Sequence, residues 1–170
     1  MANAATFFRF GGVVGTTLIA LASCTRHFEP ITPAGFVELN NQKEYAYRAT
    51  NPDGVVIAVR EIKHDPKGAL AFWERAVENE LREGRGYALL GKEAARTRSG
   101  LVGTTLRFGH DEGRNTHLYS ITVFVTGDHV FLIEVGGPKN VVEGKAGAIR
   151  AAIASFEPEE GIIHSLFGWL

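Results

Sequence analysis

The chain has a single cysteine, Cys24, among its 170 residues. One thiol cannot form a disulfide within the chain, so a disulfide-stapled scaffold is excluded. Long apolar runs are also missing: roughly ten apolar residues precede Cys24, whereas a membrane-spanning helix needs about 20. Charges of one sign do not gather in blocks, and the formal net charge is −1. This balance argues against a polyanionic partner, and we expect no nucleic acid to bind.

The remaining composition is that of an ordinary globular protein. Hydrophobic residues make up 45% of the chain and charged residues 22%, which favours a packed core over disorder. A chain of this length can bury such a core without disulfides or metal ions. We therefore expect one folded domain with short additional segments.

Residues 1–23 have the pattern of a secretory signal peptide. They contain one base, Arg9, and no acid, and a short apolar stretch leads to small residues before Cys24. The tetrapeptide LASC (21–24) resembles the bacterial lipobox. That resemblance implies cleavage between Ser23 and Cys24, a diacylglycerol on the thiol, and acylation of the new N-terminus.

A lipid on Cys24 is chemically reasonable because a cysteine thiolate is the nucleophile that accepts it. Several acyl chains on one residue anchor far more firmly than one, at about 0.8 kcal/mol per buried CH₂. The alternative is a secreted protein with an incidental cysteine. The resemblance to bacterial lipoproteins implies a periplasm-facing envelope protein. In those systems an aspartate after the cysteine favours the inner membrane, so Thr25 at that position slightly favours the outer membrane.

Composition divides the rest of the chain into three parts. Residues 24–35 contain Pro30 and Pro33 and little periodicity, which predicts a lipidated tether that lifts the domain off the membrane. Residues 36–157 carry globular patterning. Residues 158–170 form an apolar tail.

Alternating apolar residues and the turns between them predict the strands. The predicted strands cover residues 45–49, 55–62, 87–96, 101–109, 118–126 and 130–135. The pair Gly127–Asp128 is typical of a two-residue hairpin loop of type II′. In that register Val125 faces Val130 and Val123 faces Leu132.

Two helices are predicted by apolar residues at helical spacing. The first covers residues 68–83, with Asp65 placed to cap it. The second carries the stripe Val142, Ala146, Ile149, Ile153 and Phe156. Because residues 130–135 are apolar on both faces for most of their length, that strand needs cover on both sides. We expect an α+β fold, an antiparallel sheet with helices on both faces in an α/β/α sandwich.

The order of hairpin, helix, four-stranded meander and helix resembles the PsbP-like fold, which includes extrinsic photosystem subunits and DcrB-type envelope lipoproteins. The segments that carry the resemblance are FWERAVENEL (72–81), GLVGTTLRF (100–108), YSITVFVTGDHVFLIEV (119–135) and AIRAAIASF (148–156). The resemblance implies an accessory or binding role near a membrane. It transfers no catalytic residue.

Few residues carry recognisable chemistry. His110 and His117 flank a predicted hairpin tip beside Asp111, and two imidazoles with a carboxylate suit zinc or another divalent metal. The alternative is a solvated hairpin end. The neighbours His64-Asp65 and Asp128-His129 are expected to serve turns. Motifs for nucleophilic catalysis or for nucleotide phosphates are missing, so we predict no cofactor and no enzymatic activity.

The tail, Gly161–Leu170, is apolar and follows the charged segment EPEE. Its candidate contact residues are Ile162, Ile163, Leu166, Phe167, Trp169 and Leu170. Such a segment can fold back on its own domain, lie in the groove of a partner, or insert at a membrane interface.

The leading expectation is a non-enzymatic envelope lipoprotein that acts as an accessory or protein-binding module with an envelope protein as its partner. One alternative is a carrier of a small apolar ligand in a cavity between sheet and helix. The other is a metal-binding protein centred on His110 and His117.

Overall fold

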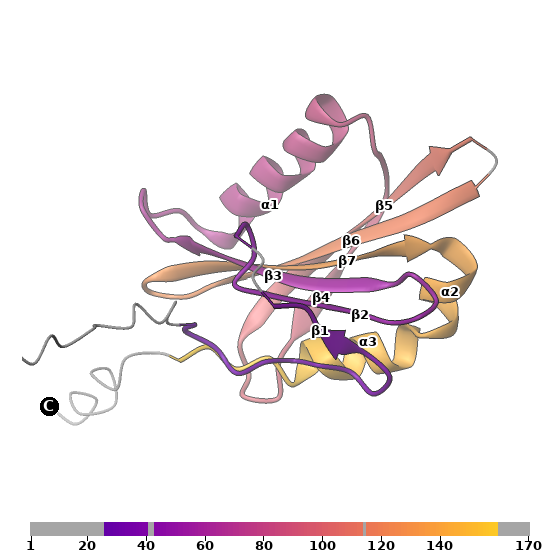
Figure 1. Ribbon diagram of the computed structural model, residues 1–170. Coiled ribbons are helices and arrows are strands. Elements are labelled where there is room, and N and C mark those ends of the chain that lie inside the picture. The colour runs from indigo at the N-terminus through magenta and orange to yellow at the C-terminus, as the bar shows by residue number, and fades with distance from the viewer. Residues whose placement is uncertain (1–25, 41–42, 114, 160–170) are drawn as a thin grey trace, which may run out of the picture.

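The computed structural model describes residues 26–40, 43–113 and 115–159. The predicted signal peptide, Cys24 and the tail residues from 160 onward lie outside these ranges. Within them, seven strands form one antiparallel sheet in the order β1-β2-β3-β7-β6-β5-β4 (Figure 1). The strands are β1 (Val37–Glu38), β2 (Tyr47–Thr50), β3 (Val56–Lys63), β4 (Ala88–Arg96), β5 (Val102–Glu112), β6 (Asn115–Val125) and β7 (His129–Pro138). The expected α+β class with an antiparallel sheet is confirmed.

The first predicted helix is present as α1 (Leu70–Asn79), which continues as a π-helical turn, η1 (Glu80–Gly84). Its N-cap is Ala69, with no side-chain cap, so the prediction that Asp65 caps this helix is wrong. No helix in the described part of the chain is long and apolar enough to cross a bilayer.

The second predicted helix is divided in two, α2 (Lys139–Gly144) and α3 (Ala146–Ala154). The apolar stripe continues through the break, but Lys145 leaves helical geometry with φ −104° and ψ 6°. The glycine before it lowers helix propensity at this point. The two short helices therefore replace one continuous helix without changing which residues face the sheet.

The hairpin register predicted from Gly127–Asp128 is confirmed. Val125 pairs with Val130, and Val123 pairs with Leu132. Since side chains alternate between the faces of a strand, this register fixes which face of the sheet each residue of β6 and β7 occupies.

Alternate residues of β7 belong to two separate apolar clusters. The α1-side core contains Val77, Leu81, Leu106, Phe108, Ile121, Val123, Val130 and Leu132. The α3-side core includes Phe28, Ile31, Phe36, Tyr47, Ile57, Phe124, Phe131, Ile133, Ile149, Ile153 and Phe156. Figure 1 draws α1 on one side of the sheet and α2 and α3 on the other. The apolar residues of β7, which alternate between its two faces, thus supply both clusters.

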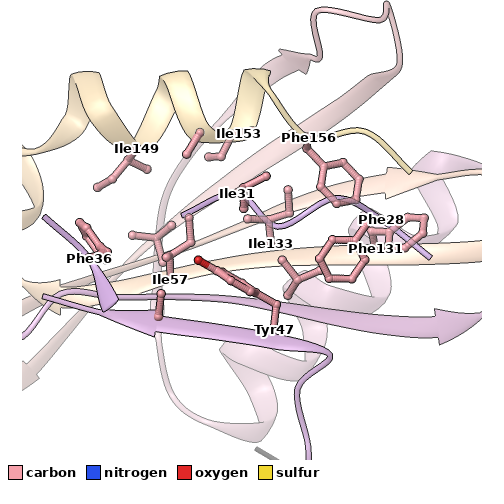
Figure 2. Close-up of a cluster of buried hydrophobic side chains, with 14 of the residues drawn as sticks. Phe28, Ile31, Phe36, Tyr47, Ile57, Phe131, Ile133, Ile149, Ile153 and Phe156 are labelled. Atoms are coloured by element: carbon pink, nitrogen blue, oxygen red, sulfur yellow. The ribbon is translucent and has the colours of Figure 1, made fainter. Parts of the chain in front are cut away.

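The segment after Cys24 is part of the α3-side core. Phe28 and Ile31 are only 2% and 3% exposed, and Figure 2 shows both side chains among those of the sheet and α3. Arg26 also donates a hydrogen bond of 2.6 Å to Glu38. The sequence predicts a tether over residues 24–35, but from Arg26 onward the chain packs against the domain. Burial of two large apolar side chains is the physical reason, because removing each of them from water stabilises the folded state by about 1.5–3 kcal/mol.

The two ends of the described domain lie side by side. Phe28 forms an antiparallel bridge with Pro158. The N–H of Glu29 donates to the carbonyl of Glu157 at 3.1 Å, and the N–H of Glu159 donates to the carbonyl of His27 at 2.7 Å. The chain therefore enters and leaves the domain at the same place.

Candidate functional site

Two imidazole side chains and one carboxylate side chain meet where the chain enters the domain. We call them the His27–Glu61–His129 cluster. Glu61 lies on β3 and His129 begins β7, and the antiparallel register pairs Glu61 with Phe131 and Lys63 with His129. Residues two apart on a strand share a face, so Glu61 and His129 are diagonal neighbours on one face. The buried side chain of Phe28 holds the adjacent His27 against them.

The cluster is closely connected. His27 Nδ1 is hydrogen-bonded to Glu61 Oε1, and the backbone N–H of His27 donates to Glu61 Oε2 at 3.3 Å. His129 Nε2 lies 3.3 Å from Glu61 Oε1. The two imidazole rings stack, with centroids 4.5 Å apart and planes 20° from parallel. One carboxylate thus connects two histidines that come from different segments.

The cluster is partly shielded but reachable from solvent. The side chains of Glu61, His129 and His27 are 11%, 23% and 41% exposed. Glu61 and His129 also line an open cleft of about 750 Å³. The rest of its lining is charged or polar and consists of Lys63, His64, Asp65, Lys67 and Asp128. A small polar ligand or ion can therefore approach the carboxylate and imidazole atoms.

The metal pair predicted at the hairpin is only partly assembled. His110 pairs directly with His117 in the register of β5 and β6, as expected. The His110 ring lies 4.7 Å from the ring of Tyr87, and His110 and Asp111 are both exposed. Among the described residues, the His27–Glu61–His129 cluster brings three possible metal-ligand atoms within 4.8 Å of one another. The described residues of this hairpin form no such group.

His64 serves a turn, as expected of the His64-Asp65 pair. Its buried ring accepts a hydrogen bond from the N–H of Gly68 at 2.8 Å through Nε2, and Nδ1 lies 2.8 Å from the carbonyl of Thr126. Both ring nitrogens are occupied by backbone groups. The side chain joins the loop before α1 to the β6–β7 hairpin.

A second polar group is buried at Glu134, which is 6% exposed. It accepts hydrogen bonds from the Tyr119 hydroxyl at 2.6 Å and from Arg60 Nε at 2.5 Å. Burial, reinforced by the Glu134 charge, raises the pKa of Tyr119 far above its ordinary value. Burial alone lowers the pKa of Arg60, but the hydrogen bonds and charges of Glu134 and Tyr45 together outweigh it, and the net shift is upward. These paired groups stabilise the sheet, and each carboxylate oxygen of Glu134 has a hydrogen-bond partner.

A groove of about 440 Å³ lies between the sheet and the α2–α3 helices. We call it the α3 groove. Its lining is mixed: Thr105, Arg107 and Ser120 contribute polar atoms, and Val142 and Ile149 contribute apolar ones. This surface suits an amphipathic molecule better than a purely apolar one.

No family model matches this chain, and no curated protein matches its sequence. Solved structures do match. The crystal structure of LpqN, involved in cell envelope biogenesis of Mycobacterium tuberculosis, is similar with a TM-score of 0.62 and 13% identity, over 76% of this chain and 81% of that chain. The solution structure of cyanobacterial PsbP (CyanoP) from Synechocystis sp. PCC 6803 has a TM-score of 0.53 and 12% identity, over 74% and 83%.

A third match is PA94 from Pseudomonas aeruginosa, described as a protein of unknown function and putative regulator. Its TM-score is 0.51 and its identity 11%, over 82% of this chain and 88% of that chain. At such identities the similarity shows the fold alone. The chain has a PsbP-like α+β fold, and the predicted resemblance in fold is confirmed.

Proposed function

We propose that this chain is a bacterial envelope lipoprotein, anchored by lipid on Cys24 and facing the periplasm. Its PsbP-like domain, with α/β/α layering, acts as a non-enzymatic accessory module that binds an envelope protein. The lipobox-like LASC segment supports the anchor. The fold that the domain shares with LpqN, a protein involved in cell envelope biogenesis, supports the location.

The observation that carries this proposal is how early the packed domain begins. Phe28 is buried only four residues after Cys24. Four extended residues span at most about 14 Å, so a lipid on Cys24 holds the domain close to the bilayer surface. An accessory protein held in this way presents a restricted set of surfaces to its neighbours in the membrane.

Substitution of Cys24 tests the anchor. Cells fed an alkyne-bearing fatty acid are expected to label the wild-type chain and to leave Cys24→Ala unlabelled, because alanine has no thiol to accept lipid. Thr25→Ala is the matched control and should label like the wild type. Equal labelling of wild type and Cys24→Ala, or a wild type without label, contradicts the anchor.

The α3 groove favours a second candidate function, a carrier of a small amphipathic ligand. Ala146 lines the groove, whereas Ala151 is an exposed residue of the same helix outside it. A carrier predicts that organic extraction of the purified protein releases about one ligand per chain, and that Ala146→Phe abolishes this by filling the groove. Ala151→Phe should retain the ligand. Extraction of no ligand from the wild type favours the accessory module instead.

A further inference from the structure

We propose that His27, Glu61 and His129 form a binding site for a divalent transition-metal cation, with zinc as the representative ion. The cluster supplies two imidazole nitrogens and one carboxylate oxygen, all within 4.8 Å of one another. Imidazole donors select transition metals over calcium and magnesium, which prefer sites made of oxygen atoms. Three protein ligands of this kind are a set that zinc uses when its fourth position is left for water.

The spacing of the donor atoms fits such an ion. Bonds of about 2.0–2.1 Å in tetrahedral geometry place neighbouring ligand atoms about 3.3–3.4 Å apart. His129 Nε2 and Glu61 Oε1 are already 3.3 Å apart. His27 Nδ1 is closer to Glu61, in hydrogen-bond contact. Its side chain is 41% exposed, so the ring has room to rotate outward when a cation takes the place of this hydrogen bond.

The surroundings orient the carboxylate and admit the ion. Glu61 Oε2 accepts the backbone N–H of His27, which leaves Oε1 directed toward the two imidazoles. Groups that orient a metal ligand in this way typically affect metal affinity 10- to 100-fold. The open cleft beside Glu61 and His129 gives the ion a route in and a place for a water ligand.

Metal binding connects three segments that are far apart in the sequence. His27 precedes the buried Phe28, while Glu61 and His129 lie on adjacent strands of the sheet. A bound cation fastens the entry of the chain into the domain to β3 and β7. This consequence holds whether or not Cys24 carries lipid, so it stands independently of the proposed anchor.

Zinc titration of the full chain without an affinity tag, purified in detergent and stripped with a chelator, tests the site. Competition with a zinc-binding dye is expected to show one zinc ion per wild-type chain. His129→Ala and Glu61→Gln should each weaken binding by about tenfold or more. His27→Gln, at a half-exposed position, should do the same with the least effect on folding.

The controls are His110→Ala and His117→Ala, which alter the other histidine pair and should leave the affinity unchanged. Circular dichroism verifies that every variant is folded. Cobalt(II) bound in place of zinc should give the strong visible absorption of a four-coordinate site, and Glu61→Gln should reduce it. The proposal is overturned by a wild type that binds no zinc, by binding that survives all three cluster variants, or by binding that depends on His110 instead.

Discussion

Replacement of Phe28 by alanine is expected to lower the free energy of unfolding by about 3–5 kcal/mol, the range for large aromatic side chains removed from a core. The Phe28 ring lies 5.9 Å from that of Phe131 and 5.5 Å from that of Phe156, centroid to centroid. It fills space between the sheet and the end of α3 (Figure 2). The truncation leaves a cavity there that the sheet and α3 cannot easily close.

Urea unfolding monitored by circular dichroism measures this effect. Val37→Ala is the matched control, because Val37 is 68% exposed and such surface substitutions usually change stability by less than about 0.5 kcal/mol. A Phe28→Ala variant as stable as this control would mean that residues 24–35 are a loose tether after all.

Replacement of Arg60 by methionine is expected to cost about 3 kcal/mol. Removal of one partner leaves the buried Glu134 carboxylate without its counter-charge, a change that typically costs about 3–5 kcal/mol. The low end of that range applies because the Arg60 side chain is 31% exposed, so solvent screens part of the interaction. Methionine keeps most of the volume of the arginine side chain. The loss of unfolding free energy therefore measures the charge pair and not a change in packing.

The double variant Arg60→Met/Glu134→Gln separates charge from packing. Glutamine keeps an acceptor for the Tyr119 hydroxyl and removes the buried charge, so the double variant should be more stable than Arg60→Met alone. Urea unfolding of the two single variants and the double variant gives the coupling energy. An Arg60→Met variant with the same free energy of unfolding as the wild type contradicts this account. So does a double variant that loses more free energy of unfolding than the two single variants together.

The central hairpin could be predicted from the sequence because its determinants are local. Gly127 and Asp128 specify the loop, and the alternating residues beside them specify the register. The segment Val130–Val135, apolar at every position except Glu134, indicates two buried faces. Strand ends are harder to predict, and β1 is not predictable because its two residues carry no pattern of their own.

The packed N-terminal segment could not be read in the same way. Its prolines and weak periodicity are typical of a linker, yet Phe28 and Ile31 are buried by sheet and helix residues distant in the sequence. The division of the second helix at Lys145 is also not predictable, because here the sequence pattern shows more order than the backbone has. The apolar stripe is continuous, and only local backbone geometry reveals the break.

The His27–Glu61–His129 cluster was also beyond sequence reasoning. Its members do not form a short motif, and His27 lies in the segment whose composition predicts a tether. The pairing of β3 with β7 would have placed Glu61 near His129, but that pairing follows from the whole sheet order. By contrast, the pairing of His110 with His117 can be predicted from the sequence, because a local hairpin places them opposite each other.

The central claim is that a lipid on Cys24 holds a domain that is packed almost from that residue onward. Both ends of the described domain lie together, at Phe28 and Pro158. The anchor and the zinc site are independent, since the first depends on a thiol and the second on imidazoles and a carboxylate.

The most direct test of this claim is the intact mass of the protein purified from the membranes of a bacterial host, measured beside Cys24→Ala. The account predicts a wild-type mass equal to residues 24–170 plus acyl groups, and a variant that retains residues 1–23 without lipid. A wild-type chain with an unmodified Cys24 would contradict it.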